Sequence, residues 1–194
     1  MPISLYRKNH KKAYRSGFTL IELIVAVAML GIITAIALPN LNTFMIRMKV
    51  DNEISELHRL LLIARNIAIN EGVSVTVCPL QADKTCSTNW EEEISVFTDP
   101  NNNNALDAGE RLVKVKNAVD NDDSLQYSQT NVTYLPTGLI ANQGAPFIFS
   151  YCPKDHVEMS RAIIITPSGR AYSSADIDND DKDEDRNGNE ITCT

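Results

Sequence analysis

The motifs that mark common enzyme sites are absent from this sequence. No glycine-rich phosphate loop, paired-cysteine zinc motif or nucleophile elbow occurs along its 194 residues. Histidine is scarce, and no plausible catalytic partner lies close in the sequence to any of the three, which are His10, His58 and His156. These absences argue against an enzyme, and we expect no catalytic residues.

Acidic residues are missing from positions 1–17, which carry five basic residues. The rest of the chain is strongly acidic, with 13 basic and 25 acidic residues. Such a surface repels phosphate backbones and attracts cations, so we do not expect a nucleic acid as a partner.

Cysteine is absent from the first 77 residues, and four cysteines follow. Four cysteines allow three pairings, which the sequence alone does not separate. An even number in an exported domain favours disulfides, whereas a cytosolic chain would keep the thiols free. We expect Cys78–Cys86 to close a short loop and Cys152–Cys193 to hold the last residues of the chain.

Residues 18–38 form an apolar run with a single charge, Glu22. A helix of this length spans about 30 Å, the thickness of the hydrocarbon core of a bilayer. The basic residues before it predict that 1–17 stay in the cytoplasm and that the rest of the chain faces the periplasm or exterior. A cleaved secretory signal, a plain anchor and a cytosolic core helix are the alternatives.

The stretch SGFTLIEL at 16–23 resembles the class III signal peptides of type IV pilins and pseudopilins. The resemblance implies that a prepilin peptidase and N-methyltransferase removes the leader 1–17. Cleavage would fall between Gly17 and Phe18, and the new amino group of Phe18 would be methylated. The apolar helix would then be retained as a filament-core segment.

Glu22 has a physical reason in such an assembly. An ionised carboxylate in hydrocarbon must be paired or lose its charge. The amine of Phe18 is the nearest cation, and its geometry within one helix is poor. We therefore expect the pair to form between neighbouring subunits, where it would set their axial stagger.

An amphipathic helix is expected over 39–70, ending near Gly72, because apolar residues recur there at steps of three and four. Together with 18–38 it predicts one long helix that could bend at Gly31 or Pro39. Two separate helices joined at Pro39 are the alternative.

Beyond the helix the apolar period changes to two, which predicts strands. They are expected at 73–78, 94–98, 111–115, 131–135, 146–151, 161–166 and 170–173. A long helix followed by antiparallel strands is an α+β fold. Residues 71–194 therefore read as one periplasmic β-rich domain.

The chain resembles the GspH/FimT group of minor pilins and pseudopilins, which includes FimU-like members. The resemblance lies in CPL at 78–80, Trp90, VFTD at 96–99 and GERLV at 109–113. The resemblance implies the pilin fold, an inner-membrane anchor and a structural role. The expected function is a minor type IV pilin that helps initiate assembly at or near the pilus tip. Its partners would be other minor pilins, the major pilin, the prepilin peptidase and the inner-membrane assembly platform.

Two alternatives remain open at this stage. One is an H-type minor pseudopilin of type II secretion, which differs only in the machine. The other is a surface pilin that binds DNA or another ligand. Some FimT-type members carry a basic motif that starts with Gly-Arg, but Gly169-Arg170 is followed here by an acidic segment.

The loop 99–110 has the oxygen-ligand spacing of a calcium loop. Its candidate ligands are Asp99, Asn101, Asn103, Asp107 and Glu110. The departures are Asn104, where a glycine is usual, and a strand in place of the exiting helix. The alternative is an Asx-rich hairpin loop. We expect no other cofactor.

The acidic segment 176–190 is a second candidate for calcium. Asp183, Asp185, Asn187 and Gly188 match the first half of a calcium loop, but no glutamate stands at the twelfth position. The alternative is a solvated, partly disordered acidic stretch.

Overall fold

The computed structural model describes residues 17–120, 122–141 and 147–193, and leaves out the side chains of 36–40. Two compact units divide the chain, one up to Thr43 and the other Phe44–Thr194. The predicted leader, apart from Gly17, lies outside the described residues.

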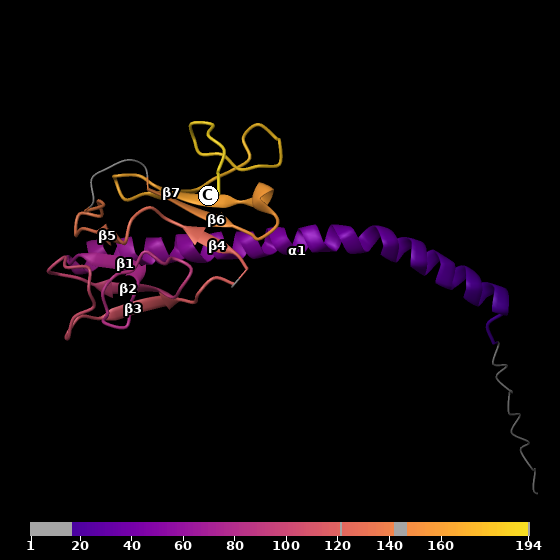
Figure 1. The fold of residues 1–194 in the computed structure, drawn as a ribbon, viewed down its shortest axis with the longest axis horizontal. Coiled ribbons are helices and arrows are strands. Elements are labelled where there is room, and N and C mark those ends of the chain that lie inside the picture. Colours follow the sequence, from indigo (N-terminus) through magenta and orange to yellow (C-terminus); the bar gives the residue numbers. More distant parts are fainter. Residues whose placement is uncertain (1–16, 121, 142–146, 194) are drawn as a thin grey trace, which may run out of the picture. The chain divides into compact units, whose positions relative to one another are not determined.

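A single helix, α1 (Leu20–Glu71), occupies the first part of the described chain (Figure 1). It is continuous through Gly31 and Pro39, so the alternative of two separate helices is wrong at the level of the backbone. It ends where Gly72 takes a positive φ of 67° and donates its N–H to the carbonyl of Ala68. Glycine is favoured at this position because a left-handed residue stops the helix without a Cβ clash.

Eight strands and one 3₁₀ turn follow in the described residues. The strands are β1 (Val75–Pro79), β2 (Ile94–Thr98), β3 (Leu112–Lys116), β4 (Ser124–Gln126), β5 (Val132–Tyr134), β6 (Phe147–Cys152), β7 (Arg161–Ile165) and β8 (Ala171–Ser173), and the 3₁₀ turn is η1 (Val157–Met159). The α+β prediction is confirmed, and each predicted strand has a counterpart. β4 was not predicted, because in Ser-Leu-Gln only Leu125 is apolar.

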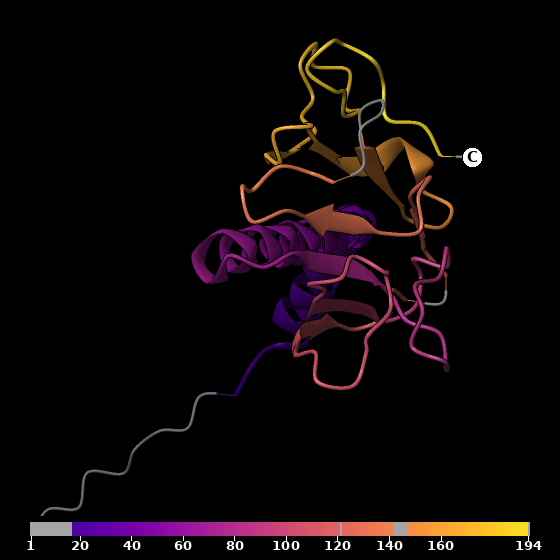
Figure 2. The ribbon, with the colours of Figure 1, turned by 90° about the vertical axis from the view of Figure 1, so that its left-hand side faces the viewer.

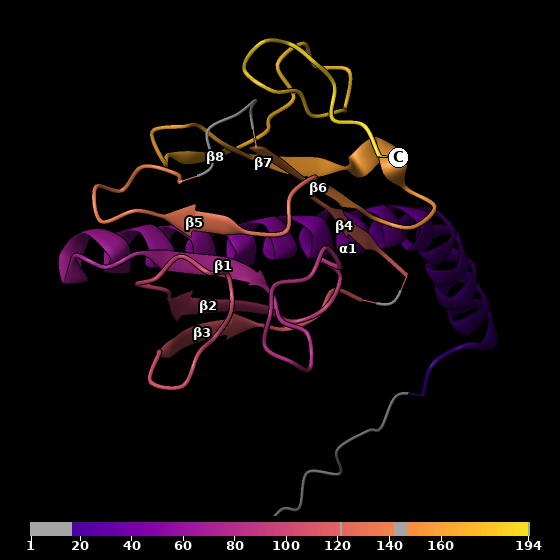
Figure 3. The ribbon, with the colours of Figure 1, turned by 60° about the vertical axis from the view of Figure 1, so that its left-hand side comes forward.

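The strands form two antiparallel sheets. Sheet 1 has the order β3-β2-β1-β5, and sheet 2 has the order β4-β6-β7-β8. In sheet 1, Val77 faces Val96 on one side and Val132 on the other. The 44–71 part of α1 lies along one side of the two sheets (Figures 2 and 3).

One hydrophobic core joins this part of α1 to both sheets. Leu57, Leu61 and Ala64 of the helix are at most 1% exposed and belong to the same buried cluster as β1 and β7. Trp90 makes edge-to-face contacts with Tyr127 and Phe149, at centroid distances of 5.0 and 4.8 Å. Burial of such side chains stabilises the fold by roughly 1.5–3 kcal/mol each.

The sheets cover less of the apolar face of α1 than its apolar pattern suggests. Val50 is the first fully buried side chain of α1, whereas Phe44, Met45 and Met48 are more than half exposed. The 3.6-residue period identified the face correctly. It gave no information on where the sheets begin to cover it.

Candidate functional site: the N-terminal helix and its attachment to the domain

The predicted processing and assembly residues lie together at the start of α1. Gly17 and Phe18 precede the helix, and Phe18 is 86% exposed. The N–H of Glu22 donates to the side-chain hydroxyl of Thr19 at 3.3 Å, so Thr19 caps the helix. Sequence reasoning missed Thr19, although Thr-x-x-Glu before an apolar run is a known helix-start pattern.

Glu22 lies in the first turn of the helix, where backbone N–H groups favour a negative charge. No ion pair involves it within the described part of the chain. The pairing with a Phe18 amine of another subunit therefore stays a prediction.

The first turns of α1 expose apolar side chains on every side. Leu20, Ile24, Val27 and Leu30 are each more than half exposed in the isolated chain. A continuous apolar surface of this kind marks contact with a partner or a membrane. Among the described residues, no helix combines the length and apolar character required for a membrane crossing. The predicted span 18–38 extends over residues 36–38, whose side chains lie outside the described residues.

Gly31 and Pro39 both have helical backbone, and a proline at 39 leaves the carbonyl of residue 35 without its N–H donor. Close to Gly31, the hydroxyl of Thr34 donates to the carbonyls of Leu30 and Gly31, both at 3.0 Å. A side chain that bonds back to the helix in this way weakens its regularity. A bend at either residue stays a prediction.

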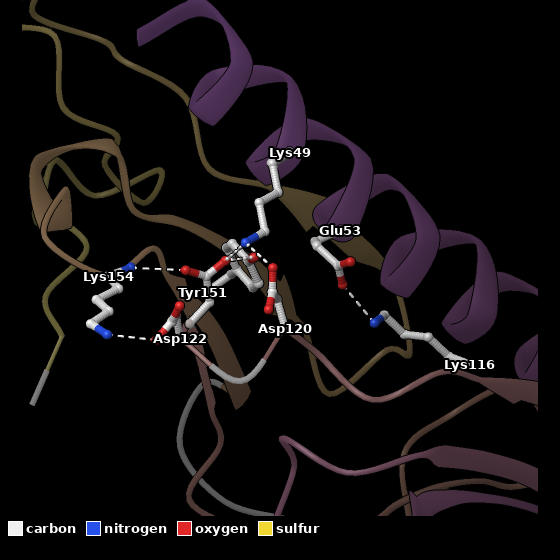
Figure 4. Close-up of polar contacts among 8 residues, drawn as sticks. Lys49, Glu53, Lys116, Asp120, Asp122, Tyr151 and Lys154 are labelled. Carbon is white, nitrogen blue, oxygen red and sulfur yellow. Dashed lines mark hydrogen bonds and ion pairs between the residues drawn. The ribbon is translucent and has the colours of Figure 1, made fainter. Parts of the chain in front are cut away.

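A polar cluster attaches the helix to the loop before β4 (Figure 4). The ammonium of Lys49 lies 2.7 Å from Asp120 and 2.8 Å from Asp123. The carboxylate of Asp123 also accepts hydrogen bonds from the phenol of Tyr151 and, at 2.9 Å, from the N–H of Lys154. Three donors, from α1, β6 and the turn after β6, thus meet at the buried carboxylate of Asp123 in the loop before β4.

These contacts favour the charged forms of Asp123 and Lys49 and the neutral form of the Tyr151 phenol. Burial alone would raise the pKa of Asp123, but the hydrogen bonds from Lys49, Tyr151 and Lys154 lower it. Burial alone would lower the pKa of Lys49, but Asp120 and Asp123 raise it. For Tyr151, burial and then the neighbouring Asp123 raise the pKa. The Lys49–Asp123 pair therefore stays ionised at neutral pH.

A second attachment joins Glu53 to the end of β3 (Figure 4). The ammonium of Lys116 lies 2.6 Å from the Glu53 carboxylate and donates to the carbonyl of Asn117 at 3.1 Å. The side chain of Lys116 is only 2% exposed and that of Glu53 is 19% exposed. Because a buried ammonium is costly without a partner, this pair fixes the helix against sheet 1.

Arg65 forms a third attachment, to the turns beside β5 and β8. Its guanidinium donates to the carbonyls of Gly138 and Ser168, at 3.1 and 3.3 Å. Gly169, the glycine of the Gly-Arg pair, has a positive φ of 74°, and a Cβ there would lie 2.0 Å from the carbonyl oxygen of Gly138. The structure therefore gives this glycine a packing role.

Both disulfides have the pairing expected from the sequence. Cys78 is joined to Cys86 with a Cα–Cα distance of 5.5 Å, and Cys152 is joined to Cys193 with a distance of 6.1 Å. The first closes the loop after β1. The second connects the end of β6 to residues that follow the acidic segment.

In the loop 99–110 the predicted calcium ligands bond to the protein itself. Asp99 is fully buried and accepts from Thr76 at 2.7 Å and from the N–H groups of Asn103 and Asn104. The side-chain amides of Asn101 and Asn103 donate to Asp107 at 3.0 and 2.8 Å, and the carboxylate of Glu110 accepts from the N–H of Asp107 at 2.9 Å. These bonds form the Asx-rich loop that was the alternative, and calcium binding here stays a prediction.

The acidic segment is more ordered than a solvated stretch. Asp183, Glu184 and Asp185 are at most 9% exposed. Asp183 accepts from Ser174 at 2.6 Å, and Asp185 accepts from the backbone of Asn187 and Asn189. The predicted half-loop at 183–188 therefore folds as a turn around Asp185.

Comparison with known proteins identifies the family. Residues 53–169, more than half of the chain, match the family described as type II transport protein GspH. The chain belongs to the GspH family. Residues 12–38 match the prokaryotic N-terminal methylation motif, so the second match includes Gly17, Phe18 and Glu22.

Relatives of this GspH-family chain are fimbrial proteins. The fimbrial protein EcpB of Eikenella corrodens is 29% identical over 135 residues, which is 70% of this chain and 78% of EcpB. A fimbrial protein of Pseudomonas aeruginosa is 41% identical over 61 residues, or 31% of this chain and 39% of that protein. The second match thus spans less than half of the relative.

A solved structure shares the fold. The crystal structure of the type IV minor pilin FimU of Pseudomonas aeruginosa has a TM-score of 0.51 and 15% identity, over 66% of this chain and 90% of FimU. The pilin fold is therefore shown for the GspH-family chain. The acidic segment 176–190 lies beyond the residues that match the family.

Proposed function

We propose that this GspH-family chain is a minor type IV pilin, a structural subunit that helps initiate filament assembly at or near the pilus tip. The observation that carries the proposal is the order of two matches, a methylation motif at 12–38 followed by a GspH domain at 53–169. Fimbrial relatives and the FimU fold support the pilus version. In this role the chain catalyses no reaction.

The N-terminal part would supply the assembly surface. Removal of 1–17 leaves Phe18 as the methylated first residue, and 18–38 anchors the precursor in the inner membrane with the domain in the periplasm. The exposed apolar side chains of Leu20 to Ile33 would then pack against other pilins in the filament core. In the second unit, Phe44, Met45 and Met48 expose further apolar side chains on α1.

The attachments on the domain would make the 44–71 part of α1 and the two sheets move as one body. Lys49, Glu53 and Arg65 each connect α1 to a different segment of the domain. When a further subunit is added at the base of the filament, α1 would transmit the resulting displacement to its domain. Polar bonds at three levels keep the domain from rotating about the helix.

A pseudopilin of type II secretion is the second candidate, favoured by the description of the matching family. It uses the same processing, anchor and assembly surface. Deletion of the gene separates the two: loss of surface pili and twitching supports the pilin, and loss of exoprotein secretion supports the pseudopilin.

Intact mass of the membrane form tests the processing step. We expect a chain that lacks residues 1–17 and carries one added methyl group. A chain that begins at Met1, or one cleaved beyond Leu38, would contradict the proposed retention of the apolar helix.

Glu22→Ala tests the assembly residue. We expect incorporation into filaments to fall at least tenfold, because the subunit loses the carboxylate that pairs with a neighbouring amine. Thr19→Ala is the matched control, since it removes the helix cap and keeps Glu22. Normal incorporation of the Glu22→Ala chain, or an equal loss in the Thr19→Ala chain, would refute the role of Glu22.

A further inference from the structure

Four carboxylates come together in the loop that follows β8. Oxygens of Asp176, Asp178, Asp180 and Glu184 lie within 4.8 Å of one another. The three aspartates are exposed and occupy alternate positions, and Glu184 approaches them from below the surface. Figure 3 shows this segment as loops beyond the edge of β7 and β8.

Glu184 is the unusual member of the group. Glu184 is only 4% exposed, and its Oε1 atom is buried without a hydrogen-bond partner among the described residues. Its other oxygen accepts the N–H of Ile177 at 2.7 Å. A buried carboxylate oxygen without a partner is costly, so this atom points to a ligand that the protein itself does not supply.

The backbone keeps Glu184 in this position. Its N–H donates to the carbonyl of Ala175 at 2.9 Å, and its carbonyl accepts from the N–H of Ala175 at 3.2 Å. This bridge closes the loop and brings the start of the segment against Glu184. The carboxylate is therefore held among the aspartates and separated from bulk water.

Cations among the described residues neutralise this group of carboxylates only in part. Arg47 pairs with Asp181, and Arg161 pairs with Asp51 and Asp183. Lys182 reaches Asp180 only at 3.7 Å and lies closer to Glu190, at 3.1 Å. Among the described residues, the four carboxylates thus face one ammonium, which they share with Glu190, and this leaves negative charge for a divalent ion.

We propose that Asp176, Asp178, Asp180 and Glu184 bind a calcium ion. The four ligand atoms are all carboxylate oxygens. Calcium takes oxygen ligands, whereas zinc prefers the nitrogen of His and the sulfur of Cys. Calcium bonds to oxygen at about 2.3–2.6 Å, so two oxygens on opposite sides of it lie about 4.8 Å apart, whereas magnesium requires closer ligands. Three exposed ligands indicate a weak site, with a dissociation constant of about 10⁻⁴–10⁻³ M, as in extracellular modules.

The site differs from the calcium loop predicted at 183–188 and does not depend on the filament role. It would fix the segment between β8 and Cys193, which the Cys152–Cys193 disulfide holds only at its far end. Bound calcium would thereby order an acidic surface of the domain.

The experiment uses the full chain in detergent, stripped of metal with EGTA, and titrates CaCl2 by calorimetry at fixed ionic strength. We expect binding in the range given above, and at least tenfold weaker binding of Mg²⁺. Asp178→Asn, an exposed change, should weaken calcium binding at least tenfold. Asp122→Asn changes an exposed aspartate outside both candidate loops; it is the matched control and should leave calcium binding unchanged. Asp107→Asn reports separately on the loop 99–110.

Glu184→Gln gives a second test, in which the melting temperature is measured with and without calcium. Without calcium this variant should melt at a higher temperature than the native chain, because an unpaired buried carboxylate becomes an amide that can donate to the aspartates. With calcium only the native chain should gain thermal stability. The proposal is overturned if 10 mM CaCl2 gives no binding heat, if Mg²⁺ binds equally well, or if binding is lost in Asp107→Asn and kept in Asp178→Asn.

Discussion

Replacing Glu53 by glutamine removes the carboxylate that pairs with the buried ammonium of Lys116. Removal of one partner of a fully buried ion pair costs about 3–5 kcal/mol. The Glu53 side chain keeps 19% exposure, and the glutamine carbonyl can still accept one hydrogen bond. We therefore expect the free energy of unfolding to fall by about 2–3 kcal/mol.

The matched control is Glu71→Gln on the same helix. Glu71 pairs with Arg111, but both side chains are about half exposed, at 45% and 53%. Exposed pairs contribute about 0–1 kcal/mol, because water already stabilises the separated charges. The two variants change the same group in the same way and differ in how deeply the ion pair is buried.

Urea denaturation of the full chain in mild detergent measures both changes. Trp90 is 1% exposed, so its fluorescence follows the opening of the domain core. The expected loss for Glu53→Gln corresponds to a melting temperature lower by about 4–12 °C for a domain of this size. Pairing Glu53→Leu with Lys116→Met should restore most of the stability, since an apolar pair leaves no buried charge.

A difference of less than about 0.5 kcal/mol between the two glutamine variants, the usual effect of a surface change, would refute this role of the buried ion pair. Burial of Lys116 would then carry no energetic weight. The attachment of α1 at β3 would rest on apolar packing alone.

Two further predictions concern the cluster at Lys49 and the turn at Gly169. Because the folded-state pKa of Asp123 is lowered, its contribution to stability is present above its ordinary value near 3.8 and is lost as the pH falls through the folded value. Denaturation curves from pH 7 down to pH 2 should show a shallower acid loss for Asp123→Asn, and an unchanged slope would contradict this. Gly169→Ala should destabilise by about 2 kcal/mol or more, because the added Cβ meets the carbonyl of Gly138. Gly72→Ala, with a similar positive φ and open space around it, should cost about 1 kcal/mol, and equal costs would exclude the clash.

The elements of the fold were predictable where the apolar period is strong. The helix expected over 18–70 is observed as Leu20–Glu71, and each predicted strand appears within a few residues. The division into two sheets was not predictable, because strand pairing joins residues far apart in the chain. Leu112, Lys114 and Lys116 alternate along β3, yet only Lys116 is buried. Its burial depends on Glu53, which lies 63 residues earlier.

The candidate sites show the same limit. The spacing of oxygen ligands identified the segment 176–190 but selected Asp183 and Asp185, which the structure uses for hydrogen bonds to Ser174 and the backbone. The group that could hold a metal ion depends on the bridge between Ala175 and Glu184. Spacing along the chain cannot show that a glutamate from the far side of a loop becomes buried among three aspartates.

The positions of the four cysteines also set an order of oxidation. Cys78 and Cys86 lie eight residues apart in the sequence, so they can meet as soon as this short segment has been synthesised. Cys152 must wait until β7, β8 and the acidic loops have followed, because Cys193 comes after all of them. If the first bond closes at that point, Cys152 finds no other free cysteine earlier in the chain. The second disulfide can therefore form only after β8, the last strand, has been synthesised.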